Sequence, residues 1–151
     1  MALIHEKLYQ SKQLAKIDLA EYIKSLAANL FLSYGVTESK VKLVVDVDDV
    51  NLDAGAVVPC ALIINELVSN SLKYAFIGSD RFENGMAQIV ISLQRDRGGK
   101  LRLTVEDNGV GLPEGFTVNT SQSLGLKLVS VLTRQLKGTL QVVSNASGTK
   151  F

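Results

Sequence analysis

The stretch that decides the fold is Asn65-Glu66-Leu67-Val68-Ser69-Asn70-Ser71-Leu72-Lys73-Tyr74-Ala75-Phe76, which closes an apolar segment of helical length over residues 55–76. On a regular helix, four of its polar side chains share one arc of about 100°: Glu66, Asn70, Lys73 and Tyr74. The opposite side is apolar and predicts a core-facing stripe: Ala61, Ile64, Val68, Leu72 and Ala75.

A solvated surface is the ordinary explanation of such a polar face. Asparagine, however, is a poor choice for an exposed helix interior, where Glu or Lys serves better. An amide oxygen can instead ligate Mg²⁺, which takes few protein ligands beside phosphates and water. A lysine can neutralise phosphate charge. The face of Asn70 and Lys73 therefore has two explanations, a solvated surface or a phosphate and metal site.

The segments before this helix read as a helix and a strand. Tyr22, Ile23, Leu26 and Leu30 recur at helical spacing, Asp18 and Glu21 resemble a capping box, and Gly35 is a stop signal. Alternation over residues 41–47 predicts a strand, and a second short strand is expected around Val50–Leu52.

After the helix, residues 77–85 predict a loop and Gly98-Gly99 predicts a hairpin between strands 87–95 and 100–106. Residues 107–122 predict a further loop. A helix is expected over 123–137, capped by Ser121 or Ser123 and stopped by Gly138. Strands are expected at 139–144 and near Phe151. This order of elements predicts an α+β fold, a two-layer sandwich with helices on one face of the sheet.

Length, charge and composition limit the classes of protein that this chain could belong to. The chain has 151 residues, 16 Lys plus Arg and 15 Asp plus Glu, which suits one domain without a basic field for nucleic acid. The single cysteine, Cys60, fits a buried thiol in a reducing compartment. No apolar run approaches about 18 residues and no secretory signal is evident, so we expect a cytoplasmic protein that does not enter the membrane.

Two glycine-containing segments could complete a site with the helix. Asp107-Asn108-Gly109-Val110-Gly111 follows an alternating strand, where its glycines permit a tight turn and close approach of a ligand. Asp107 could accept a bond from an exocyclic amine, although an ordinary Asn-Gly turn reads the same way. Ser123-Leu124-Gly125-Leu126 opens a helix whose free N–H groups could face phosphate, although a plain loop entering a helix is commoner.

Together these motifs resemble two-component sensor histidine kinases. The segment from Asn65 to Phe76 resembles their N box, residues 107–111 their G1 box, and residues 123–129 their G2 box. The resemblance covers roughly residues 18–151. It implies a Bergerat ATP-binding fold of the GHKL type, with a mixed, mostly antiparallel sheet covered on one face by helices.

The resemblance also implies roles at the site. Asn70 would ligate Mg²⁺, and Asp107 would accept from the adenine amino group. Lys73 would touch phosphate, and Tyr74 would line the adenine or ribose side. Gly109 and Gly111 would admit the nucleotide, and the G2 residues would face the phosphates: Leu124, Gly125 and Leu126. Glu66 would polarise water or activate the acceptor imidazole.

Two departures from the family pattern concern the N and G2 boxes. Ser71 replaces the alanine that is usual after the asparagine, a change we expect to be silent. The G2 region has one central glycine where many kinases have two or three, which affects the expected phosphate contacts of the lid.

The only histidine, His5, lies within a segment that resembles the second helix of a dimerisation hairpin, downstream of the acceptor position. We therefore expect residues 1–17 to be a remnant of that hairpin and 18–151 to be the catalytic domain. The implied function is phosphoryl transfer from ATP to a histidine outside this chain, in a homodimeric parent that passes phosphate to a response regulator. A GHKL-type ATPase or serine kinase, or a non-catalytic nucleotide-binding signalling module, are the alternatives.

Overall fold

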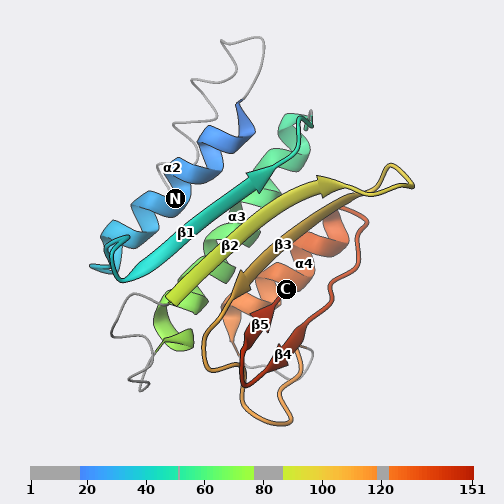
Figure 1. The fold of residues 1–151 in the computed structure, drawn as a ribbon. Coiled ribbons are helices and arrows are strands. Elements are labelled where there is room, and N and C mark those ends of the chain that lie inside the picture. The colour runs from blue at the N-terminus through green and yellow to red at the C-terminus, as the bar shows by residue number, and fades with distance from the viewer. Residues whose placement is uncertain (1–17, 51, 77–86, 119–122) are drawn as a thin grey trace.

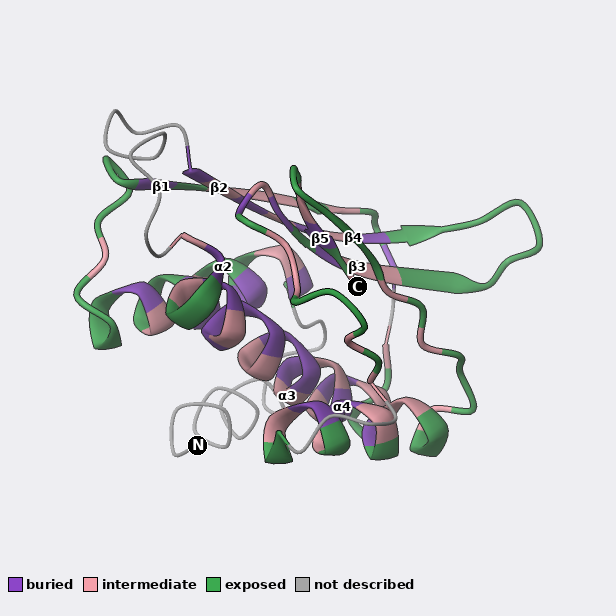
Figure 2. Cartoon of the chain, turned by 90° about the horizontal axis from the view of Figure 1, so that it is seen from below, coloured by how far each residue is buried: buried purple, intermediate pink, exposed green. Residues whose placement is uncertain are grey.

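The computed structural model describes residues 18–50, 52–76, 87–118 and 123–151. Within them a sheet of five strands forms one layer, and the helices α2, α3 and α4 cover one of its faces (Figure 1). Seen from below, the helices and the sheet form two separate layers (Figure 2). This arrangement confirms the predicted α+β sandwich.

The sheet has the order β1-β2-β3-β5-β4. Its strands are β1 (Val41–Val47), β2 (Ala87–Arg95), β3 (Leu101–Asp107), β4 (Val143–Asn145) and β5 (Gly148–Lys150). Only β1 and β2 are parallel, and the other pairs are antiparallel. The parallel pair needs a long crossover, which runs through α3. The mixed, mostly antiparallel sheet is confirmed.

The helices begin at side-chain caps. Asp18 accepts from the Glu21 N–H at 3.1 Å at the start of α2 (Leu19–Ser33), as the capping pattern predicted. Asp53 accepts from the Ala56 N–H at 2.9 Å and starts α3 (Ala54–Asn70). A π-helical turn, η1 (Ser71–Ala75), continues α3 without a break. The helix α4 (Leu124–Gln135) is capped by Ser123, one of the two predicted caps.

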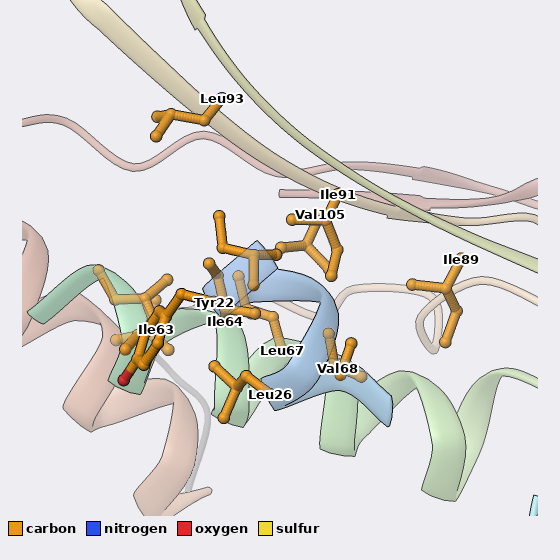
Figure 3. Packing of buried hydrophobic residues seen from close by; sticks show 14 of the residues in the cluster. Tyr22, Leu26, Ile63, Ile64, Leu67, Val68, Ile89, Ile91, Leu93 and Val105 are labelled. Atoms are coloured by element: carbon orange, nitrogen blue, oxygen red, sulfur yellow. The ribbon is translucent and has the colours of Figure 1, made fainter. Parts of the chain in front are cut away.

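The core lies between the two layers, and α3 is its centre because it packs against both α2 and α4. Ile64 and Val68 of α3 face Ile89 and Ile91 of β2 (Figure 3), and all four side chains are fully buried. In β2 every second residue from Ala87 to Leu93 is buried, which is the period expected of a strand with one core face. The apolar stripe of α3 therefore fixes the helix on the sheet.

Three predictions about local structure were wrong. Val50 and Leu52 are not in a strand. The strand expected at 139–144 begins only at Val143, because residues 138–142 connect α4 to the sheet edge. The left-handed residue after α4 is Lys137, with φ of 58°, rather than Gly138. Residues 1–17, the loop 77–85 and Ser121 lie outside the described residues.

Among the described residues, one helical stretch has a length and composition that could span a membrane, which was not predicted from the sequence. Ala54–Ala75 would be long enough to cross a membrane by length and composition, but 50% of its most apolar window is buried inside this structure. A core helix of a soluble protein has the same properties. Its position between α2, α4 and the sheet gives its apolar side chains a partner without a membrane.

Candidate nucleotide site

The carboxylate of Asp107 is held at the end of β3 by three donors. The Ser71 hydroxyl donates to Oδ2 at 2.9 Å, and the N–H groups of Gly109 and Thr149 donate to Oδ1 at 3.0 and 3.3 Å. The side chain is buried, with an exposed fraction of 8%. A carboxylate has about four acceptor positions. Within the described part of the chain, one position on Oδ2 is left for a further donor.

The turn after Asp107 packs directly on the end of η1. The Val110 N–H donates to the Ala75 carbonyl at 2.8 Å. A side chain at Gly109 would collide with that same carbonyl, and one at Gly111 would collide with the carbonyl of Asn145. Gly111 also has φ of +82°, a conformation that glycine tolerates best. The two glycines are therefore required by close backbone contacts with the protein itself.

A cavity of about 240 Å³ opens beside Asp107, between α3, the start of α4 and the turn after β3. Apolar groups and a few polar groups line it, which is typical of a small-molecule site. The lining residues are Leu67, Asn70, Ser71, Tyr74, Ala75, Asp107, Gly111, Leu112, Pro113, Phe116, Ser123, Leu126, Thr149 and Phe151.

Five of the predicted site residues line this cavity: Asn70, Tyr74, Asp107, Gly111 and Leu126. They come from α3, η1, the end of β3 with the turn after it, and α4, so the structure brings the three motifs together around one space. Tyr74 sits at the margin, with an exposed fraction of 66%. Gly109 lies behind the lining, against Ala75.

Lys73 does not line the cavity. Its ammonium lies 5.8 Å from the centre of the Tyr34 ring, just after α2, within the range of a cation–π contact. The regular helix assumed from the sequence ends at Asn70, and the wider π turn changes the direction of the side chains that follow. Contact between Lys73 and phosphate stays a prediction that requires the side chain to leave Tyr34.

The side chain of Glu66, a residue of α3, lies beside the beginning of α4. A side chain at Gly125 would come within 2.5 Å of Glu66 Oε2, so the carboxylate stands close to the N-terminal turn of that helix. The positive end of a helix dipole favours an anion there. Glu66, Gly125 and the exposed Leu124 are outside the cavity lining, at the edge that Ser123 and Leu126 form.

Several residues that contribute to the site were not predicted from the sequence. Ser71 was expected to be silent, but its hydroxyl bonds to Asp107. Thr149 and Phe151 reach the cavity from the last strand and the chain end. Ser71 could have been identified from the sequence, because it follows Asn70 within the same motif. No sequence pattern places Thr149 and Phe151 at the site, because only strand pairing brings β5 beside β3.

No group of three or more His, Cys, Asp or Glu side chains within the described ranges is placed to hold a metal ion. Asn70 is the residue of the described cavity whose amide suits Mg²⁺, since that ion uses few protein ligands when phosphates and water complete its shell.

Comparison with known proteins identifies the family. Residues 55–151 match the family described as histidine kinase-, DNA gyrase B- and HSP90-like ATPase, and residues 1–34 match a histidine kinase family. The chain belongs to the first of these families. It is an ATP-binding domain of the histidine kinase type.

Similar proteins are sensor kinases. The blue-light-activated histidine kinase 2 of Erythrobacter litoralis is 32% identical over 133 residues, which are 88% of this chain and 36% of that protein. The sensor histidine kinase PdtaS of Mycobacterium tuberculosis is 33% identical over 91 residues, 59% of this chain and 17% of that protein. The chain therefore spans about a third of the length of the first relative and less than a fifth of the length of the second.

Solved structures support the fold. The histidine kinase domain of the Erythrobacter litoralis EL346 blue-light-activated kinase has a TM-score of 0.81 at 24% identity, covering 97% of this chain and 68% of that one. Full-length ShkA, solved in complex with AMPPNP, has a TM-score of 0.64 at 19% identity, covering 91% and 29%. The ATP-binding domain assigned by family therefore has the three-dimensional form of its relatives.

Proposed function

We propose that this domain binds Mg-ATP in the cavity beside Asp107 and supplies the γ-phosphoryl group to a histidine of its parent sensor kinase. The observation that carries the proposal is the buried Asp107 carboxylate, fixed by three donors, with one acceptor position left beside a mostly apolar cavity of about 240 Å³. A fixed acceptor of this kind suits the exocyclic amine of adenine.

The other residues then have the following roles. Asn70 would hold Mg²⁺ between the helix and the phosphates, and the ion would offset charge on the transferring phosphoryl group. Tyr74 would cover the base or ribose at the cavity margin, and Lys73 would turn from Tyr34 toward phosphate. The residues Leu124, Gly125 and Leu126 would present the N-terminal turn of α4 to the phosphates.

Glu66 would take a proton from the acceptor imidazole. In the transfer step, the lone pair of one imidazole nitrogen forms the new bond to phosphorus, and the bond from the γ-phosphorus to its bridging oxygen breaks. ADP leaves with that electron pair, and the proton on the other nitrogen passes to a base. Catalysis would rest on positioning and charge stabilisation, without a covalent intermediate on this domain.

The acceptor would come from outside the cavity. We propose that residues 1–17 belong to the second helix of a dimerisation hairpin, that residues 18–151 form the catalytic domain, and that the parent is a cytoplasmic-side homodimer with a response regulator downstream. The match of residues 1–34 to a histidine kinase family supports a kinase hairpin origin for the N-terminal segment, and it extends past residue 17 through α2. His5 lies within that match, at a position downstream of the acceptor.

The direct test uses a longer chain that includes the upstream helix. Incubated with Mg²⁺ and γ-labelled ATP, it should acquire acid-labile, alkali-stable phosphate on a histidine of that helix, and Asp107→Asn should remove the signal. The variant His5→Gln serves as control and should retain the label. Acid-stable phosphate on serine, or release of phosphate without labelled protein, would support the other ATPases of this fold instead.

A further inference from the structure

Ser71 occupies an unusual position for a helical serine. It is buried, with an exposed fraction of 7%, and lies in the π-helical turn that follows Asn70. A serine within a helix commonly bonds back to a carbonyl of the preceding turn. Here its hydroxyl donates across the site to Asp107 Oδ2 at 2.9 Å, and both residues line the cavity.

This bond determines what Ser71 can offer a ligand. A serine hydroxyl has one proton to donate, and the proton is used on Asp107. The oxygen therefore presents only lone pairs to the cavity, as Asp107 Oδ2 does. The two oxygens form a pair of adjacent acceptors on the same wall of the site.

A pair of acceptors discriminates between purines at one position of the ring. An exocyclic amine carries two hydrogens and satisfies the pair. A carbonyl at that position brings a third acceptor and no donor, so lone pairs face one another at the buried carboxylate, which is costly.

The geometry points to Ser71 as a specificity-determining residue. It orients Asp107 Oδ2 and forms with it an acceptor pair that selects a purine with a 6-amino group and rejects a 6-oxo purine. This inference rests on the proposed adenine nucleotide site and adds a second residue to the recognition of the base.

The chain provides a matched control. Ser69 is two residues earlier, in the last turn of α3, is buried to a similar degree at 6% exposure, and does not line the cavity. A serine that only packs the helix should behave as Ser69 does. The variants Ser71→Ala and Ser69→Ala remove the same atom at two equally buried positions, of which only Ser71 lines the cavity.

The experiment measures, by titration calorimetry with Mg²⁺, the affinity of the full chain for three triphosphates. ATP has the amine, inosine triphosphate has a carbonyl at the same position, and purine riboside triphosphate has neither. We expect Ser71→Ala to reduce the preference for ATP over inosine triphosphate about tenfold, as loss of a hydrogen bond to a charged group predicts. Its affinity for purine riboside triphosphate should stay within about twofold of wild type, and Ser69→Ala should leave all three affinities unchanged.

An equal loss of affinity for all three nucleotides in Ser71→Ala would overturn the inference, because it would mean a packing role. An unchanged ATP preference in that variant would also overturn it. A different result would show that the proposed adenine nucleotide site itself is wrong. In that case wild type would show no preference for ATP, or Asp107→Asn would keep the whole preference, whatever Ser71 does.

Discussion

At the scale of single residues, Asp107 organises the site. Its carboxylate joins η1, the turn after β3, and β5 through Ser71, Gly109 and Thr149. A buried carboxylate is costly without such donors. The same bonds that make the charge tolerable also fix its orientation toward the cavity, so recognition of a base and stability of the strand ends depend on one side chain.

Asn70 is expected to account for the metal dependence of binding. The variant Asn70→Ala should bind ATP with the same affinity in Mg²⁺ as in EDTA, because the amide oxygen that would hold the ion is gone. The measurement is a calorimetric titration in both buffers. Asn65→Ala is the control, since Asn65 lies on the same helix but not in the cavity lining. A metal effect that survives in Asn70→Ala would contradict the role.

Cys60 is expected to react slowly with alkylating reagents. Cys60 is partly rather than fully buried in α3, and this burial raises the pKa of its thiol, so less thiolate, the reactive form, exists at a given pH. Alkylation of the folded chain at pH 8 should be slower than that of the chain in urea, and should accelerate as the pH rises further. Mass spectrometry against time gives both rates. Equal rates in the folded and unfolded chain would contradict the burial of this thiol.

At the scale of elements, the contact between the turn after β3 and the end of η1 holds the two sides of the site together. The variant Gly109→Ala places a methyl group against the carbonyl and the side chain of Ala75. We expect a loss of about 2–4 kcal/mol in the free energy of unfolding, because the backbone has to shift. Urea denaturation measures it.

Gly98→Ala is the matched control for Gly109→Ala. Gly98 lies in the exposed β2–β3 turn, where an added methyl group meets only the Asp96 side chain at 3.4 Å. The free energy of unfolding should change by less than about 1 kcal/mol there. If the two variants were equally stable, the packing of the turn on η1 would be wrong.

The end of α4 offers a stabilising change. Lys137 adopts φ of 58°, its N–H donates to the Arg134 carbonyl at 2.9 Å, and the Gly138 N–H donates to the Thr133 carbonyl at 2.9 Å. This is the Schellman pattern, in which glycine suits the left-handed position. Lys137→Gly should raise the free energy of unfolding by about 1 kcal/mol. A loss of stability in the same urea experiment would mean that Lys137 makes a compensating contact.

At the scale of the whole molecule, much of the fold follows from local patterns. Alternation over residues 41–47, the Gly98-Gly99 hairpin signal and the apolar stripe of α3 were enough to predict three strands of the sheet and the helix that covers them. Two features had no local signal. One is the π turn after Asn70, which contacts the turn after β3 through the Ala75 carbonyl, and the other is the position of Lys73 beside Tyr34.

The short strands at the chain end were the least predictable part. β4 and β5 have three residues each, too few for a periodic pattern, and their position depends on pairing with β3. Because β5 carries Thr149 to Asp107, the part of the site furthest away in sequence was missed with it. Residues on α3 and the two glycine motifs were found because their chemistry lies within single continuous segments.

The most direct test of the central claim is a calorimetric titration of this chain with ATP in the presence of Mg²⁺, for wild type and Asp107→Asn. We predict one binding site per chain in wild type and an affinity at least about tenfold lower in the variant, because an uncharged amide places a donor where the amine needs an acceptor. Asp49→Asn, an exposed aspartate remote from the cavity lining, should bind as wild type does. Absence of binding by wild type, or equal affinity in Asp107→Asn, would contradict the assignment of the cavity to ATP.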